Sequence, residues 1–353
     1  MKADRKEFLA ALQWVGKACP KRANLPILEN VRLESKDGYL TLAATNLEIA
    51  AERTLPADGE LPPQLLEHRA LLQIAKSAKS EDIEIGNKIK AGNRSYDLPR
   101  ADIEEYPEFP KAAYHVATLD CDLSDILKRV ELACGTDPRF SLEGFLFEVS
   151  KQGLNIIATD GKQLYIARIG EPAEKEFMRL IVPHAAASFN GWKSPQFYVN
   201  TEKEEDRNLL QIRDGNSSLT LRLTEGKFPD WRSILIKDEP AASWIFDPKE
   251  LEEEIKALAV VMDETTNMLK FDIKEGQAIL SAGSKSRGKA TSTIRVADDG
   301  EGKFGLNPNY LLDAIKATTP KGEKTTISYW GSDRPIHFAS TSEIEAIVMP
   351  LTD

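Results

Sequence analysis

Two glycine-rich segments near the C-terminal end have spellings that could bind phosphate. Residues 283–290, GSKSRGKA, match the nucleotide-binding loop GxxxxGK[ST], except that Ala290 replaces the hydroxyl that would hold Mg²⁺. That loop opens a helix, whereas residues 289–296, KATSTIRV, are rich in β-branched residues and indicate a strand. Residues 300–305, GEGKFG, fit GxGxxG but lack a βαβ frame. We therefore expect a hairpin loop at the first segment and a turn at the second.

Side chains that commonly carry catalysis or metals are scattered along the chain. No GxSxG motif occurs, and Asp160 in ATDGK follows a strand pattern, where Asp-Gly is more typical of a turn than of a general acid. No two histidines have HxxxH or HxH spacing; they are His68, His115, His184 and His337. The sequence therefore predicts that the protein is not an enzyme and holds no metal or cofactor.

The cysteines and the hydropathy predict a cytoplasmic protein. The cysteines Cys19, Cys121 and Cys134 are odd in number and have no CxxC spacing, which argues against a disulfide framework or a zinc site. No apolar run approaches the length of a membrane-spanning helix, and residues 1–6 are charged rather than signal-like. We expect no membrane association.

The net charge of −10 is distributed unevenly. Lysines and arginines are concentrated in residues 1–22 and 67–79, whereas acidic residues cluster in 202–206 and 250–254. A basic patch on an acidic body is compatible with DNA contact, but it is also typical of a solvated face. Charge alone leaves both interpretations open.

The chain ends in an apolar segment, IVMPL, at residues 347–351. Such a segment is most often a core strand. Methionine and proline near a terminus can also line an adaptable peptide-binding groove.

The elements that position these residues come from a repeat. Residues 28–45, LENVRLESKDGYLTLAAT, align without a gap with residues 142–159, LEGFLFEVSKQGLNIIAT, and a fainter copy covers 268–283. A repeat spaced by more than 100 residues is a small domain rather than a solenoid turn. We predict three domains, 1–115, 116–243 and 244–353.

Each copy has the same pattern of elements. Apolar residues at 3–4 spacing predict a first helix at 8–18, 123–133 and 248–261, and a second helix at 65–78, 184–189 and 308–318. Alternating apolar residues around Lys36-Asp37-Gly38 predict paired strands, and each later copy closes on a strand, 217–223 or 343–349. The fold class is therefore α+β, with two helices on an antiparallel sheet in each domain.

In combination, the motifs resemble the bacterial DNA polymerase III β subunit family, the sliding clamps. The motifs are LPILENVRLE, LAATNLEIA, LEGFLFE, ATDGKQL, GKFPDW, GLNPNYLLDAI and IVMPL, which cover all three repeats in order. The resemblance implies three tandem DNA-clamp (processivity-fold) domains and a head-to-tail homodimeric ring around double-stranded DNA. It also implies tethering of the DNA polymerase III α subunit, and binding of the clamp loader and other proteins with a clamp-binding motif.

The resemblance also implies site residues. Arg22 and Arg139 match DNA-contacting positions, and Val260 and Val261 match an apolar pair at the dimer interface. A groove for partner peptides would be formed by Leu142, Thr159, Gly161, Leu164, Pro229, Ile234, Asn307, Tyr310, Ile347, Met349, Pro350 and Leu351.

This sequence departs from the family pattern beside the groove. Lys162-Gln163 replaces the family's His-Arg, Ser233 stands where arginine is common, and the chain ends in Leu-Thr-Asp. One alternative is therefore a clamp-like paralogue or mobile-element clamp with altered partner preference. Another is a nucleotide-binding protein that uses the 283–290 loop.

Overall fold

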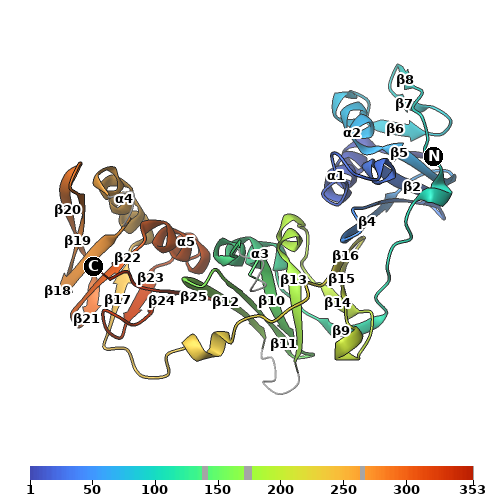
Figure 1. Cartoon of the computed structure of the whole chain (residues 1–353). Helices are drawn as coiled ribbons and strands as arrows, with labels where there is room; N and C mark the ends of the chain where they lie inside the picture. The colour runs from blue at the N-terminus through green and yellow to red at the C-terminus, as the bar shows by residue number, and fades with distance from the viewer. Residues whose placement is uncertain (137–141, 171–176, 263–266, 353) are drawn as a thin grey trace. The chain divides into compact units, whose positions relative to one another are not determined.

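The computed structural model describes residues 1–136, 142–170, 177–262 and 267–352 (Figure 1). The chain forms two compact units. The first unit holds Met1–Ser124 and Ala185–Thr224, and the second holds Asp125–His184 and Glu225–Asp353.

An eight-stranded antiparallel sheet forms the body of the first unit. Its strands, in spatial order, are β5 (Leu61–Glu67), β2 (Asn30–Lys36), β3 (Tyr39–Thr45), β4 (Ile49–Pro56), β16 (Ser217–Arg222), β15 (Leu209–Asp214), β14 (Gln196–Val199) and β9 (Tyr114–Thr118). Strands β4 and β16 pair antiparallel, with Ile49 opposite Leu221, so the first and second repeats share one sheet.

Two helices and a small sheet complete the first unit. Helix α1 (Arg5–Val15) packs on α2 (His68–Ser77), and the Asp4 side chain caps α1 by accepting a hydrogen bond from the Glu7 N–H at 2.9 Å. The small sheet has the order β1 (Lys2–Asp4), β6 (Asp82–Ile85), β7 (Ile89–Ala91), β8 (Arg94–Tyr96).

A nine-stranded antiparallel sheet forms the body of the second unit. Its order is β13 (Met178–Pro183), β10 (Gly144–Val149), β11 (Gly153–Thr159), β12 (Gln163–Gly170), β25 (Ile344–Val348), β24 (Ile336–Ala339), β23 (Thr325–Tyr329), β17 (Ala242–Phe246) and β21 (Ala297–Asp299). The pairing of β12 with β25 joins the second repeat to the third.

The rest of the second unit packs around this sheet. A four-stranded sheet has the order β20 (Gly288–Arg295), β19 (Gln277–Ser284), β18 (Leu269–Lys274), β22 (Gly302–Leu306). The helices are α3 (Leu123–Val130), which a 3₁₀ turn at Glu131–Ala133 follows, α4 (Pro248–Leu258) and α5 (Pro308–Thr318). Proline opens α4 and α5, and the preceding Asp247 and Asn307 cap them.

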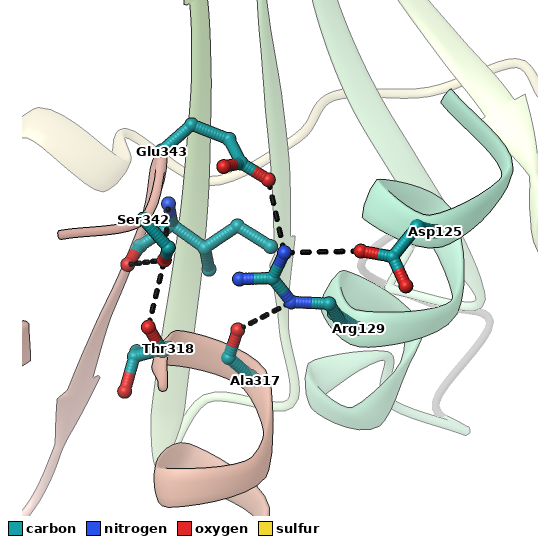
Figure 2. Close-up of polar contacts among 7 residues, drawn as sticks. Asp125, Arg129, Ala317, Thr318, Ser342 and Glu343 are labelled. Carbon is teal, nitrogen blue, oxygen red and sulfur yellow. Dashed lines mark hydrogen bonds and ion pairs between the residues drawn. The ribbon is translucent and has the colours of Figure 1, made fainter. Parts of the chain in front are cut away.

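Arg129 connects the second and third repeats (Figure 2). From α3, its Nε donates to the last-turn carbonyl of Ala317 in α5 at 2.7 Å, and its Nη1 lies 3.1 Å from Asp125 and 3.0 Å from Glu343. A cation at a helix C-terminus offsets the negative end of the helix dipole. The arginine therefore fixes α3 against α5 and against the chain that enters β25.

The structure confirms the α+β class with antiparallel sheets. The predicted turn is a two-residue hairpin turn in which Asp37 and Gly38 have φ of 53° and 84°, and the predicted helix over 308–318 has those bounds. The three-domain division stays a prediction. Within the described residues, no helix is long and apolar enough to cross a membrane.

Four predictions of local structure were wrong in part. The helix predicted at 8–18 starts at Arg5 and ends at Val15. Residues 65–67 belong to β5 rather than to a helix, because Leu65 and Leu66 pair with β2. The second helix of the middle repeat is a short 3₁₀ helix, His184–Ser188. Only Gly300 and Glu301 of GEGKFG lie outside a strand, because β22 starts at Gly302 and pairs with β18.

Candidate functional site

The twelve residues predicted to form a peptide groove all lie in the second unit. They come from β11, β12 and the chain before β10, from the start of α5, from the C-terminal segment, and from residues 225–241, which we call the linker. The linker, yellow in Figure 1, crosses the face of the nine-stranded sheet opposite α3 and α5. The structure thus gathers residues from Leu142 to Leu351, which are far apart in sequence.

The floor of the groove is the contact between β12 and β25. Leu164 pairs with Ile347, and both belong to one apolar cluster with Trp231 of the linker. Leu164 and Ile347 are buried, whereas Ile234, which packs against the same cluster, is partly exposed. These residues therefore form the base of the site as well as part of the core.

The turn after β11 forms one side of the groove. The Thr159 hydroxyl donates to the Gln163 carbonyl at 2.6 Å and accepts from the Gly161 N–H at 3.1 Å. The Asp160 carboxylate accepts from the N–H groups of Lys162 and Gln163 at 2.8 and 2.9 Å. Asp160 is therefore a turn residue, as predicted, rather than a general acid.

The first repeat contains the same turn without a groove. Thr45 donates to the Ile49 carbonyl at 2.8 Å and accepts from the Leu47 N–H at 3.0 Å. Leu47 has φ of 79°, close to the 87° of Gly161. Since the first copy tolerates a leucine there, glycine at 161 has a further effect: it leaves the exposed surface beside Thr159 without a side chain.

The C-terminal segment forms the opposite side. The Met349 N–H donates to the Lys162 carbonyl and the Leu351 N–H to the Gly305 carbonyl, each at 2.8 Å. Met349 is 41% exposed although it is a large apolar residue. A cavity of about 280 Å³ that includes Ile347 opens beside linker residue Leu235, and another of about 450 Å³ reaches Leu351. Both cavities are lined by charged as well as apolar side chains, for example Glu345 in the first and Asp272 in the second. The exposed methionine itself suits an adaptable binding surface.

Helix α5 contributes its first turn. Asn307 is the N-cap and accepts from the Asn309 N–H at 2.9 Å, so it has a structural role. Burial, the charge of Asp160 and a hydrogen bond to that carboxylate raise the pKa of Tyr310 to about 12. Tyr310 therefore stays a neutral donor at neutral pH and ties α5 to the turn after β11.

The departures from the family pattern differ in their exposure. Gln163 is 4% exposed, and its Nε2 donates to the Leu132 carbonyl at 3.0 Å, away from the Leu164 face of β12. Lys162 and Ser233 are exposed. Of the Lys162-Gln163 pair, only Lys162 is therefore placed to meet a partner directly.

The predicted groove residue Leu142 is buried, and its carbonyl accepts a hydrogen bond from the Gly135 N–H.

The remaining predicted site residues belong to other segments of the chain than the groove residues. Arg22 is exposed in the chain between α1 and β2, whereas Arg139 lies outside the described residues. Val260, in a 3₁₀ turn that follows α4, is 73% exposed, and Val261 is half-buried. An apolar side chain this exposed is a candidate contact with another protein.

The 283–290 segment is a hairpin, as predicted. Strand β19 ends at Ser284, β20 starts at Gly288, and Gly288 has φ of 87°. No helix follows, so the segment lacks the helix N-terminus that a phosphate-binding loop requires.

The sequence did not reveal that the linker is held by a buried carboxylate. Glu148 of β10 is fully buried and is bound by Arg232 of the linker. Glu148 and Glu34 are identical in the repeat alignment, but alternation of polar and apolar residues does not tell whether the face that carries them is covered. The identity of the two glutamates was the available signal.

Known proteins match the chain along its full length. Profiles described as the N-terminal and C-terminal domains of DNA polymerase III beta subunit match residues 1–110 and 233–352. The beta sliding clamps of Pseudomonas putida and Haemophilus influenzae are each 25% identical, with 98% of both chains covered.

Solved structures share the fold. A DnaN sliding clamp from Pseudomonas aeruginosa, bound to griselimycin, has a TM-score of 0.88 at 22% identity and covers 100% of this chain and 99% of its own. The DNA polymerase sliding clamp of Bacillus subtilis has a TM-score of 0.85 at 22% identity, covering 100% and 98%. The fold, both profiles and the curated relatives agree in one conclusion: this chain belongs to the DNA polymerase III β subunit family.

Proposed function

We propose that the chain is a DNA sliding clamp that encircles duplex DNA as a head-to-tail homodimer and tethers DNA polymerase III to its template. The full-length match to clamps in sequence and in fold carries this proposal. The family is a non-catalytic processivity factor, so the chain is not an enzyme.

Contact with DNA requires positive charge but no reading of bases. Four of the helices each carry an exposed lysine: Lys6, Lys76, Lys128 and Lys316. Helix α4 also carries exposed lysines, Lys249 and Lys256, but its glutamates outnumber them. Binding through a few phosphate contacts is weak and falls with salt, which suits a protein that slides. Arg22 and Arg139 remain our proposed phosphate contacts.

The partners would use the groove of the second unit. The DNA polymerase III α subunit, the clamp loader and other proteins with a clamp-binding motif would insert apolar side chains beside Leu164, Ile347 and Met349. We place the protein in the cytoplasm, where a tether for replication meets bacterial DNA.

Dimer closure would join the two small sheets. Strand β8 is an edge of one and β20 an edge of the other, and edge strands offer unpaired backbone groups to another chain. The 3₁₀ turn that holds Val260 packs against β20. The head-to-tail contact proposed here would therefore combine strand pairing with burial of Val260 and Val261.

The decisive test of this function is topological. A clamp loaded on nicked circular DNA by the clamp loader should be retained during gel filtration at moderate salt and released when a restriction enzyme linearises the circle. Retention that does not change on linearisation would show ordinary DNA binding and contradict the proposal.

A clamp-like paralogue with altered partners is the second candidate, and exposed Lys162 is the observation that favours it. A fluorescent peptide from the C-terminal region of the replicative DNA polymerase III α subunit separates the two. Binding supports the replicative clamp, whereas its absence in a chain that encircles DNA supports the paralogue.

Arg22→Ala should weaken retention on nicked circles more at low salt than at high salt. The side chain is exposed, and the screening length falls from about 30 Å at 0.01 M salt to about 8 Å at 0.15 M. The lifetime of the loaded clamp at several salt concentrations measures the effect, with Lys203→Ala as an exposed control. An equal loss at every salt concentration would contradict a phosphate contact.

A further inference from the structure

The linker crosses the sheet without a regular strand or a long helix of its own. The linker's one element of regular secondary structure is the 3₁₀ turn Trp231–Ile234. It nevertheless carries two predicted groove residues, Pro229 and Ile234. The position of these two side chains therefore depends on what holds the linker to the sheet.

The strongest contact between linker and sheet is an ion pair. Both oxygens of Glu148 accept hydrogen bonds from Arg232, Nη1 to Oε1 and Nη2 to Oε2, each at 2.7 Å. Two parallel charge-assisted bonds fix the relative orientation of the two groups as well as their distance.

Other groups complete the environment of the carboxylate. Asn155, opposite Glu148 on β11, donates to Oε2 at 3.3 Å, and Arg179 of β13 lies 3.3 Å from Oε1. The Trp231 Nε1 reaches Oε1 at 3.5 Å. Burial favours the neutral form, but the hydrogen bonds and charge of Arg232, with smaller effects of Asn155 and Arg179, hold the pKa of Glu148 below its usual range.

Apolar contacts alone would fix the linker less well. Trp231, Ile234 and Leu235 pack on the cluster around Leu164, and such packing has little directionality. A shift of the linker by one residue would remove Arg232 from Glu148 and leave a buried charge without its main partner, which is strongly destabilising. Setting register in this way is the best-attested use of buried ionic groups.

The first repeat provides an internal comparison. Glu34 occupies the position equivalent to Glu148, but it lies 2.6 Å from Arg32, two residues away on its own strand, and is one-third exposed. In the first copy, Glu34 thus forms a local, partly exposed ion pair. In the second copy, the equivalent Glu148 forms a buried ion pair with a residue 84 positions away.

We propose that Glu148 and Arg232 are positioning residues that hold the linker as a wall of the partner groove, without touching the partner. This inference rests on the proposed function, since its effect is measured as binding of a partner peptide to the groove. The pair fixes Pro229 and Ile234 on either side of Arg232, so loosening it weakens peptide binding while the sheet stays folded.

The test combines affinity with linker exposure. Glu148→Gln and Arg232→Lys are compared with the wild type by fluorescence anisotropy with the polymerase α-subunit peptide, and by the rate of trypsin cleavage after exposed Lys227 and Lys237. Loss of one bidentate charged pair should weaken binding about tenfold and accelerate cleavage, with unchanged far-UV circular dichroism. Glu34→Gln, the matched control, should change neither measurement more than about twofold.

Each outcome tests the Glu148–Arg232 pair, which we call the anchor of the linker. Unchanged affinity and cleavage in both variants would overturn it, as would weaker binding without faster cleavage. Arg232→Lys keeps a positive charge next to Glu148 but cannot form the two parallel hydrogen bonds. This variant therefore tests the proposal if Glu148→Gln fails to fold. If the wild type binds no peptide, the proposed function fails, and faster cleavage in the variants would still support the anchor.

Discussion

A chain that ends at Val348 should fold and dimerise but bind the polymerase peptide about 100-fold more weakly than the full chain. The truncation removes Met349 and Leu351 from one side of the groove, and each apolar side chain that a peptide would cover is worth about 1.5 kcal/mol or more, or about tenfold in affinity. Fluorescence anisotropy measures the affinity, and sedimentation velocity measures the dimer.

The position of the cut follows from the strand pairing. Ile347 and Val348 are buried in β25 and pair with β12, so a cut before them would remove core as well as groove. Residues 349–352 lie beyond the strand, and Met349 and Leu351 each make one backbone hydrogen bond, to Lys162 and Gly305. A chain that ends at Leu351 is the control and should bind like the full chain. Full affinity after the cut at Val348 would show that the C-terminal segment is no part of the groove.

The elements of the fold were predictable where the signal was local. Proline after Asp247 and after Asn307 marked the starts of α4 and α5, and Asp37-Gly38 marked a hairpin turn. Residues 65–67 were mistaken for helix because LLEHRALLQIAKSA is apolar at helical spacing throughout. Pairing of Leu65 and Leu66 with β2, a long-range interaction, overrides that preference.

The candidate site was predictable only in part, for a physical reason. Resemblance supplied the groove residues, and the structure brings Leu164 of β12 beside Ile347 of β25, two strands that local patterns could not pair, with Met349 directly after β25. The anchor was not predicted, because alternation along a strand says which residues share a face but not whether that face meets water. Glu148 faces the linker, whereas Glu34, in the same pattern, is partly exposed.

Val260→Asp should convert the dimer into a monomer. Val260 is the most exposed of the large apolar residues in the described chain. The aspartate would place a charge beside the edge strand β20, at the proposed head-to-tail dimer contact, which we call the seam. Burying an unpaired carboxylate costs several kcal/mol, so the dimer dissociation constant should rise at least about 100-fold. Light scattering coupled to gel filtration measures the mass, with Val260→Ala as a milder variant.

A substitution at the dimer contact and one in the groove should have opposite effects, so each variant serves as a control for the other. All predicted groove residues lie in the second unit of one chain, so the Val260→Asp monomer should keep its affinity for the peptide but fail to be retained on circular DNA. Met349→Asp places its charge at the exposed side of the groove and should do the reverse, losing peptide affinity while staying dimeric on circles. If Val260→Asp stays dimeric, the seam lies elsewhere. If it becomes monomeric and also loses the peptide, the groove needs the second chain, because nothing in a single folded chain would then account for the loss.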